Sequence, residues 1–399
     1  MKVLAPTTAF PRFEGDVTGN FILYMFRLIK DVDFKVLAPS DIKAKRYEKI
    51  GNVEIERFSY TWPSKYQKLT YGEGIHSNLK KSFIAKMQIP LLGIGLTKAI
   101  LKYYNKFDLI HAQMVFAGYA SYLTKNLMYT KRPLVISFYG KDILNCKQNL
   151  NIYRPMLNKA DLILALTKNM EKMLLEMGVE RNKIIVHHLG IDCNKLKYKK
   201  PSNKKDNIRF LIVARFIEKK GIDYGIKAFS KVVKKYPKSK LVLVGDGPEV
   251  NYLLELTKNL KLEKNVEFIN NLKSQNPREV TLKEFYKADI FLLPSITTAD
   301  DYGGAPIVLT EAEAVGLPCI VFEDAGNSEI VLDKRTGYVV EQKNIDEFAK
   351  RMIELIENPR LRNRFSTAGR KYIEESFNNE IQPKKLKQIY TNLLNNKKL

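Results

Sequence analysis

Short apolar runs and longer amphipathic stretches follow one another along the whole chain. Runs such as Leu134–Gly140 and Phe291–Leu293 end at glycine or proline, which predicts buried strands. The stretches between such runs, for example Ile222–Lys235, carry apolar residues at helical spacing. This alternation predicts an α/β fold of doubly wound parallel sheets, in which ligands bind at the carboxyl ends of the strands.

The predicted strands form two series, separated by a change in composition. The first series is Lys2–Leu4, Phe34–Leu37, Val53–Phe58, Asp108–Ala112, Leu134–Gly140, Asp161–Leu166 and Lys183–His188; the second is Arg209–Val213, Lys240–Val244, Val266–Ile269, Phe291–Leu293, Pro318–Phe322 and Tyr338–Val340. Residues 194–207 between them are rich in lysine and poor in apolar residues, which favours a linker. We therefore predict a first domain over 1–193, a second over 208–375, and a C-terminal helix over 376–399 that can return to the first domain.

The stretch Phe291–Val321 is the clearest candidate for a binding site. A strand ends at Pro294, a polar loop containing Gly303 and Gly304 follows, and a helix is predicted to begin at Pro306. A helix N-terminus behind two glycines offers a phosphate unpaired N–H groups and a favourable dipole. The alternative is an ordinary strand–helix unit of an α/β sheet.

The pattern inside this helix predicts which side chains face the core. We expect Ile307, Val308 and Leu309 to pack inward, while Glu311 and Glu313 take other faces. Glu311 lies one to two turns into the helix, so it would reach a ligand held at the helix tip.

Two further turns carry candidate phosphate ligands. Gly15 and Gly19 lie in the loop after the first strand, where they would let backbone N–H groups approach a phosphate or a sugar; a plain turn is the alternative. Arg215 stands at the end of a strand, and Lys220 follows just before Gly221. Two cations at the rim of a cleft suit a diphosphate, although a solvated basic turn would look the same.

The charge of the chain widens the set of candidate partners. Lysine and arginine number 67 against 43 acidic residues, which gives a net charge of +24. This favours an anionic partner, unless the lysines only solvate the surface. The segment Ile75–Phe107 holds six lysines and no acid, interleaved with large apolar residues. It predicts either two amphipathic helices packed on a sheet or a basic surface that lies on an anionic membrane.

Cysteine and histidine usage gives no indication of a metal site. The three cysteines, Cys146, Cys193 and Cys319, are far apart, and the four histidines form no metal-binding motif. We therefore predict no metal and a reduced, cytoplasmic environment. No apolar run approaches the ~20 residues that span a bilayer, and the first residues do not have the pattern of a signal peptide.

Together these motifs resemble a known family. Arg215 with Lys220–Gly221, the turn Gly245–Pro248, Pro294–Ser295 and the helix Pro306–Pro318 resemble the C-terminal half of glycosyltransferase family 4. The N-terminal half has Phe107–Gln113, Ser137–Asp142, Ala160–Thr167 and Lys183–Asp192 in the family's order. The resemblance covers about residues 1–375 and is strongest to transferases of exopolysaccharide and lipopolysaccharide synthesis. It implies the GT-B fold, in which two Rossmann-like domains face each other across a cleft.

The resemblance also implies roles for individual residues. Arg215 and Lys220 would neutralise the donor diphosphate, and Glu311 would hold the nucleotide ribose. Further donor contacts would come from Gly15, Asp16, Gly303, Gly304, Ala305, Pro306 and Ile307. Acceptor contacts would come from His111, Tyr139 and Asp142. Beyond the nucleotide-sugar donor, no cofactor and no metal is implied.

The chain departs from the family pattern at two positions. Tyr139 stands where the family usually has histidine, so hydrogen bonding to sugar hydroxyls replaces an acid or base role there. Gly303 stands where the family has the first glutamate of its Glu-x7-Glu motif. Asp300 or Asp301 would supply the missing carboxylate, and we expect Asp301, the nearer in sequence, to do so. The alternative is a lost or altered activity.

We therefore predict a cytoplasmic enzyme, peripheral to the inner face of the cell membrane. It would transfer a sugar, with retention, from a nucleotide-diphosphate sugar to a glycan or lipid-linked acceptor in cell-surface polysaccharide synthesis. One rival, a nucleotide-sugar epimerase of the same fold, would need its own catalytic carboxylates and histidine. Another rival, a nucleic-acid-binding protein, would need a recognised binding module or a basic stripe with aromatic residues, and the sequence indicates neither.

Overall fold

The chain folds into two units of similar size, each built on its own sheet. The computed structural model describes residues 1–16, 18–72, 74–297, 305–324 and 326–395. Unit 1 comprises residues 1–190 and 379–399, and unit 2 comprises residues 191–378. Residues 194–207 contain no helix or strand, and they lie just after the point where the chain passes from unit 1 to unit 2.

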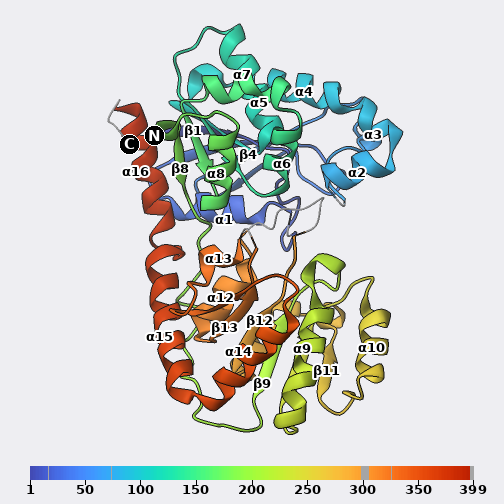
Figure 1. The fold of residues 1–399 in the computed structure, drawn as a ribbon. Coiled ribbons are helices and arrows are strands. Elements are labelled where there is room, and N and C mark those ends of the chain that lie inside the picture. The colour runs from blue at the N-terminus through green and yellow to red at the C-terminus, as the bar shows by residue number, and fades with distance from the viewer. Residues whose placement is uncertain (17, 73, 298–304, 325, 396–399) are drawn as a thin grey trace. The chain divides into compact units, whose positions relative to one another are not determined.

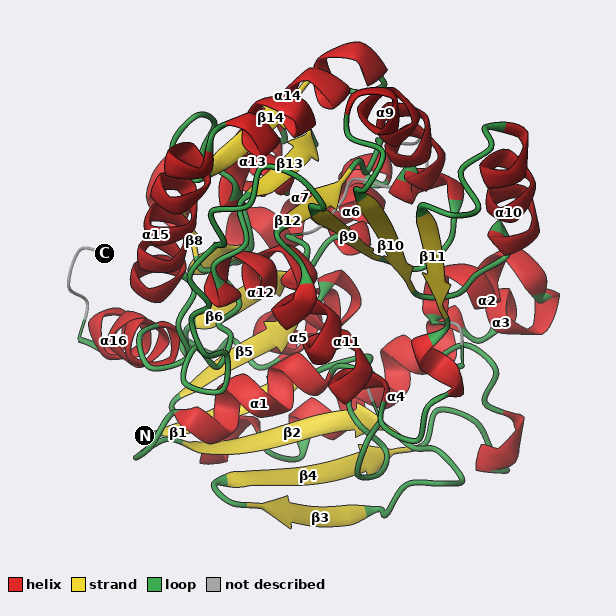
Figure 2. Ribbon diagram, turned by 90° about the horizontal axis from the view of Figure 1, so that it is seen from below, coloured by secondary structure: helices red, strands yellow, loops and turns green. Residues whose placement is uncertain are grey.

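Unit 1 contains a sheet with the strand order β3–β4–β2–β1–β5–β6–β7–β8. Neighbouring strands are parallel except for β3, which pairs antiparallel with β4 (Figure 2). The strands are β1 (Lys2–Pro6), β2 (Asp33–Pro39), β3 (Tyr47–Ile50), β4 (Val53–Phe58), β5 (Leu109–Gln113), β6 (Leu134–Phe138), β7 (Leu162–Ala165) and β8 (Ile184–Val186). The helices are α1 (Asn20–Leu28), α2 (Ile75–Lys81), α3 (Phe83–Met87), α4 (Ile89–Leu101), α5 (Val115–Leu127), α6 (Lys141–Gln148), α7 (Leu150–Lys159), α8 (Lys168–Glu176) and α16 (Gln382–Leu394).

The last helix, α16, belongs to unit 1 although all of unit 2 precedes it in the chain (Figure 1). Leu386, Ile389 and Tyr390 join the core that α1 forms with the first strands. The hydroxyl of Tyr390 also lies 2.6 Å from Nδ1 of His111 on β5. Apolar burial and one buried polar contact therefore hold α16 against this sheet.

Unit 2 contains a parallel sheet with the order β11–β10–β9–β12–β13–β14. The strands are β9 (Arg209–Val213), β10 (Lys240–Val244), β11 (Val266–Ile269), β12 (Ile290–Leu293), β13 (Cys319–Phe322) and β14 (Gly337–Val340). The helices are α9 (Ile222–Lys235), α10 (Val250–Asn259), α11 (Pro277–Lys287), α12 (Ile307–Val315), α13 (Asn327–Ile330), α14 (Ile345–Glu357) and α15 (Pro359–Ser376).

Alternate residues of each unit 2 strand enter two separate cores, as the twofold period of a strand requires. Phe210 and Ile212 of β9 pack with α9 and α14 on one face of the sheet. Leu211, between them, packs with α11, α12 and α15 on the other. Because both faces are covered, the strands are mostly apolar, which explains why they are conspicuous in the sequence.

All predicted strands are present within two residues of their predicted bounds. Five elements were not predicted, namely β3, α6, α11, α13 and α14. The edge strand β3 is short and only half-buried, so its apolar pattern is weak. The helix α6 is short and polar and begins directly after Gly140. The prediction of two helices in Ile75–Phe107 was also wrong in number, because the chain forms α2, α3 and α4 there.

A buried arginine on α15 ties the segment before β9 to the rest of unit 2. The side chain of Arg362 is fully buried. Its Nη2 donates hydrogen bonds to the carbonyl oxygens of Ser202, at 2.9 Å, and Lys204. Its Nη1 donates to those of Leu355 and Ile356, the latter at 2.9 Å. One guanidinium group thus satisfies carbonyls from two distant segments.

Replacing Arg362 with methionine would leave these carbonyls without their donor. Each buried polar group that loses its partner costs about 1–3 kcal/mol, so we expect unit 2 to lose at least about 3 kcal/mol of unfolding free energy. Urea unfolding followed by circular dichroism would measure this loss. Arg360→Met, at an exposed position of the same helix, is the control. Equal losses in both variants would contradict the role given to Arg362.

Candidate functional site

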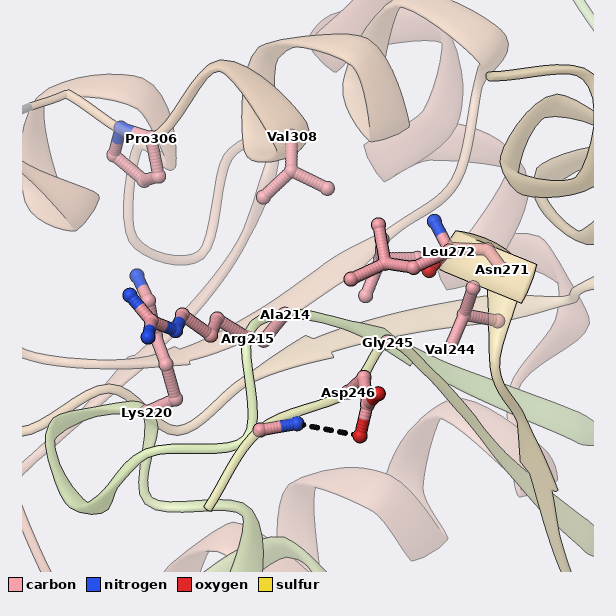
Figure 3. A pocket seen from close by; sticks show the side chains of 12 residues that line it. Ala214, Arg215, Lys220, Val244, Gly245, Asp246, Asn271, Leu272, Pro306 and Val308 are labelled. Atoms are coloured by element: carbon pink, nitrogen blue, oxygen red, sulfur yellow. Dashed lines mark hydrogen bonds between the residues drawn. The ribbon is translucent and has the colours of Figure 1, made fainter. Parts of the chain in front are cut away.

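A cavity of about 850 Å³ opens at the carboxyl ends of β9 and β10 in unit 2 (Figure 3). It is lined by Val213, Ala214, Arg215, Lys220, Val244, Gly245, Asp246, Gly247, Asn271, Leu272, Pro306 and Val308. Ligands of open parallel sheets bind at this edge, where the loops after the strands leave room.

Glycines allow the turns around this cavity to approach one another closely. A Cβ atom on Gly221 would lie 2.0 Å from the carbonyl oxygen of Pro294, and one on Gly245 would lie 1.9 Å from that of Ala214. Gly221 also has a φ of 57°, and Gly245 a φ of 147°. No other residue type fits these positions without moving the backbone, so the shape of the cavity depends on them.

Arg215 and Lys220 approach the same end of the cavity from one turn. Arg215 follows β9 and is exposed, while Lys220 ends the short turn Glu218–Lys220 before α9 and is half-buried. Figure 3 shows the nitrogen atoms of both side chains close together on the side of Pro306. Two cations gathered in a partly open cavity favour a ligand that carries several negative charges.

The helix α12 begins at the same cavity. It begins at Ile307, one residue after the predicted start, with Pro306 at the N-cap position, and Val308 of its first turn lines the cavity. The N–H groups of a first helical turn have no acceptor within the helix, and the helix dipole places partial positive charge there. The cavity therefore combines two side-chain cations with a helix start, an arrangement suited to phosphate.

The predicted orientation of α12 was wrong for two side chains. Ile307, expected to pack inward, is 45% exposed. Glu313, expected on an outer face, is fully buried, and its Oε1 accepts a hydrogen bond of 2.7 Å from the hydroxyl of Thr336. Burial raises the pKa of Glu313 well above its ordinary value, which favours the neutral form, and the side chain belongs to the core.

Glu311 does not line the cavity but is held beside α11. Its Oε1 lies 2.7 Å from Nη2 of Arg278, and its side chain is largely buried. Such an ion pair fixes the position of the carboxylate. The role of Glu311 as a ribose ligand stays a prediction.

Some predicted site residues have no structural description. Asp300, Asp301, Gly303 and Gly304 lie outside the described residues, and their roles stay predictions. Ala305 is described, and it packs against the core beneath α12.

Sequence reasoning missed two lining residues, Asn271 and Leu272. Both follow β11, the neighbour of β10, so their position at a strand's carboxyl end was the signal that could have found them. Oδ1 of Asn271 is buried and has no hydrogen-bond donor among the described residues.

In unit 1 an ion pair braces the predicted donor loop after β1. Oδ2 of the buried Asp16 accepts hydrogen bonds from Nε of Arg12 at 2.7 Å and from its backbone N–H at 3.0 Å. Oδ1 accepts one from the N–H of Thr18 at 3.1 Å. Burial alone would raise the pKa of Asp16, but these bonds outweigh it and hold the pKa well below its ordinary value. Both carboxylate oxygens of Asp16 thus accept hydrogen bonds from within the loop. Contacts of Asp16 and of its neighbour Gly15 with the donor substrate stay predictions.

The predicted acceptor residues differ in accessibility. His111 is fully buried, with Nδ1 at 2.6 Å from Tyr390 Oη and Nε2 at 2.7 Å from Ser137 Oγ. Burial lowers the pKa of His111 to about 3, so the ring is neutral. This burial does not support the predicted acceptor contact, because neither ring nitrogen is available. Tyr139 is half-buried after β6, and its hydroxyl donates to Oε1 of Gln113 at 2.6 Å.

Asp142 lies in the first turn of α6, next to Tyr139. Its Oδ1 accepts hydrogen bonds from the backbone N–H of Tyr139 at 2.9 Å and of Ile143 at 3.1 Å. Its Oδ2 is buried without a donor among the described residues. Burial raises the pKa of Asp142 to about 7, so the protonated and ionised forms coexist near neutral pH.

Two family models match consecutive parts of the chain. The model described as Glycosyltransferase Family 4 matches residues 30–195, and the model described as Glycosyl transferases group 1 matches residues 194–372. The chain belongs to glycosyltransferase family 4. The resemblance inferred from its motifs is thereby confirmed.

Curated relatives of this family 4 member are named for polysaccharide biosynthesis. It is 28% identical to the amylovoran biosynthesis glycosyltransferase AmsK of Erwinia amylovora over 70% of each chain. It is 29% identical to the putative colanic acid biosynthesis glycosyltransferase WcaL of Escherichia coli over 59% of this chain and 58% of WcaL. The second match thus spans less than two thirds of that relative.

A solved structure confirms the fold class of this family 4 member. Anabaena HepE, crystallised with UDP, has a TM-score of 0.71 and 17% sequence identity, and the match covers 98% of this chain and 100% of that chain. The predicted GT-B class, with two parallel-sheet Rossmann-like domains, is therefore correct. Among the residues that the structure describes, no helix is both long enough and apolar enough to cross a bilayer.

Replacing Asp142 with asparagine should remove one source of pH dependence from unit 1. The unfolded carboxyl titrates near a pKa of 4 and the folded one near 7, so between these values the folded protein binds more protons and its stability falls as the pH rises. Asparagine does not ionise. Relative to wild type, we expect Asp142→Asn to gain about 2 kcal/mol of unfolding free energy between about pH 5 and about pH 8.

Urea unfolding at a series of pH values would measure this gain. Asp33→Asn, at an exposed position of the same unit, is the control. A stability difference between Asp142→Asn and wild type that does not change with pH would show that burial does not perturb this carboxyl group.

Proposed function

We propose that this protein is a retaining glycosyltransferase that takes its sugar from a nucleotide-diphosphate donor. The observation that carries the proposal is the unit 2 cavity, in which Arg215, Lys220 and the first turn of α12 meet at the carboxyl edge of the sheet. Each of these groups favours negative charge, and together they suit the two phosphates of a nucleoside diphosphate.

The proposed chemistry follows from where charge develops. As the bond from the sugar to the diphosphate breaks, negative charge grows on the leaving phosphate oxygens. Fixed cations and a helix dipole stabilise that charge more in the transition state than in the ground state, which lowers the barrier. Arg215 and Lys220 supply this charge in the proposed mechanism, which uses no metal ion. In retention, the acceptor hydroxyl attacks from the face that the diphosphate leaves.

Two features support a nucleotide as part of the donor. The related fold of Anabaena HepE was solved with UDP. In this chain Glu311, held by Arg278 at 2.7 Å, supplies a fixed carboxylate on α12 for the ribose hydroxyls. Asn271, which lines the cavity, is a further candidate ligand of the nucleotide. Asp301 is the proposed contact to the donor sugar.

A glycan or lipid-linked acceptor fits the names of the relatives, which refer to amylovoran and colanic acid biosynthesis. Tyr139 and Asp142 of unit 1 are the proposed acceptor ligands, because a phenol and a carboxyl group both hydrogen-bond sugar hydroxyls. A nucleotide-sugar epimerase and a nucleic-acid-binding protein remain the rivals. Neither accounts for two cations and a helix start in one cavity as directly.

Removing either cation should weaken transfer without unfolding the protein. We expect Arg215→Ala and Lys220→Ala each to raise the barrier by about 2–4 kcal/mol, which lowers kcat/KM by about 30- to 1000-fold, because each loses a charge-assisted contact to the leaving group. A thermal-shift screen of nucleotide sugars would first identify the donor. Transfer is then measured with that donor, and binding with the matching nucleoside diphosphate.

The control is Lys234→Ala, which removes an exposed lysine of α9 in the same unit. Thermal unfolding of all three variants checks that they fold. Wild-type turnover in both Arg215→Ala and Lys220→Ala would refute the diphosphate assignment. A second outcome is that both variants bind the nucleoside diphosphate more weakly, while even the wild type transfers no sugar to any acceptor. The cavity would then be a nucleotide-binding site, and the proposed transfer reaction would be wrong.

A further inference from the structure

The helices α3 and α4 carry a second apolar stripe that faces away from the core. Ile84, Met87, Leu91 and Ile94 recur at the three- and four-residue spacing of one helix face, and all four are exposed. Only Gln88, itself in a helical conformation, separates the two helices, so the stripe continues from one to the other. Phe83, at the start of α3, adds a side chain that is 76% exposed.

The opposite face of the same helices already accounts for their packing. Ala85, Leu92, Leu96 and Ile100 are buried against unit 1. The side chain of Gln88 is buried too, and it anchors the junction by accepting from the N–H of Lys68 at 2.9 Å and donating to the carbonyl of Tyr66 at 2.8 Å. The exposed stripe therefore adds nothing to the fold, and a contiguous exposed apolar patch of this kind marks an interaction site.

The helices that carry the stripe hold basic residues and no acidic one. The segment Ile75–Phe107, which contains α2, α3 and α4, has six lysines and no acidic residue. Lys86 of α3 and Lys98 of α4 are exposed beside the stripe, and Lys80 and Lys81 end α2 just before it. Figure 1 shows α2 and α3 at the rim of unit 1, beyond the strands of its sheet.

We propose that this face of α3 and α4 is a docking surface for an anionic lipid bilayer. The four stripe residues and Phe83 would enter the boundary between headgroups and acyl chains, and the lysines would lie at the level of the acidic headgroups. An amphipathic helix with apolar residues flanked by lysines binds in this way, in the plane of the interface. The surface lies in unit 1, so it is separate from the proposed donor cavity in unit 2.

Charge complementarity favours a membrane over a second copy of this chain. A twofold interface would bring two sets of these lysines together without an acid on α2, α3 or α4 to pair with them. Protein interfaces are in general depleted in lysine. An anionic bilayer suits both parts of this surface, since it offers apolar chains to the stripe and negative headgroups to Lys86 and Lys98.

The proposal is tested by flotation of the full chain with vesicles of phosphatidylcholine, alone or mixed with phosphatidylglycerol. We expect binding to the mixed vesicles at low salt, loss of binding at high salt, and little binding to phosphatidylcholine alone. Trp62, the only tryptophan, is almost fully exposed. In the sequence it stands two residues after Tyr60, and Tyr60 packs against Gly95 of α4. A blue shift of its fluorescence on adding mixed vesicles is a second expected signal.

Two variants separate the apolar from the electrostatic part. Ile84→Ser with Met87→Ser and Leu91→Ser removes the stripe, and Lys86→Glu with Lys98→Glu reverses charge beside it. Each should lower vesicle affinity by on the order of tenfold or more. The matched controls are Ile152→Ser with Leu175→Ser and Lys159→Glu with Lys172→Glu, which change exposed residues of α7 and α8. Thermal unfolding confirms that every variant folds.

Three results would overturn the proposal. Wild-type protein that does not float with the mixed vesicles at low salt excludes it. Equal losses in Lys86→Glu with Lys98→Glu and in its glutamate control would show that only the overall positive charge matters. A dimer in analytical ultracentrifugation that the serine variant abolishes, with vesicle binding unchanged, would assign the stripe to a second copy. Because vesicle binding needs no sugar donor, none of these results depends on the proposed transfer activity.

Discussion

The close approach of backbone turns at the carboxyl edge of its sheet is the constraint on which the unit 2 site depends. Cβ atoms on Gly221, Gly245 and Gly247 would lie 2.0, 1.9 and 2.2 Å from the carbonyl oxygens of Pro294, Ala214 and Phe216. With hydrogen in place of these side chains, the turns after β9 and β10 can touch each other and still leave an open cavity. The same packing fixes the turn that carries Arg215 and Lys220, so the cations are positioned before any ligand binds.

The sheets of both units could be predicted from sequence because their strands are covered on two faces. Continuous apolar runs with glycine or proline at their ends are hard to mistake, and every predicted strand is present. The orientation of α12 could not be predicted in this way. Glu313 is buried because Thr336, far along the chain, donates a hydrogen bond to it at 2.7 Å, and no local pattern shows that partner. A charged residue in an apolar helix suggests an outer face unless its distant partner is known.

The candidate site shows the same limit in unit 1. His111 and Tyr139 stand at similar places in the sequence motifs, yet only Tyr139 is partly accessible. His111 is enclosed by Ser137 from the neighbouring strand and by Tyr390 from α16, which is close in space only after the chain has returned from unit 2. Motif position indicated where ligands bind. It could not show which side chain tertiary contacts had already occupied.

The basic residues behind the net charge of +24 differ in whether an acidic residue pairs with them. Many lysines are paired with acids, as Lys102 is with Glu56 at 2.8 Å and Lys147 with Glu176 at 2.9 Å. The segment that holds α2, α3 and α4 has six lysines and no acidic residue, and an apolar stripe accompanies them. Exposed charges act over about 8 Å at physiological ionic strength, so they attract a partner that comes close but cannot hold it alone. A stable complex needs burial as well, and α3 and α4 offer both basic charge and exposed apolar side chains.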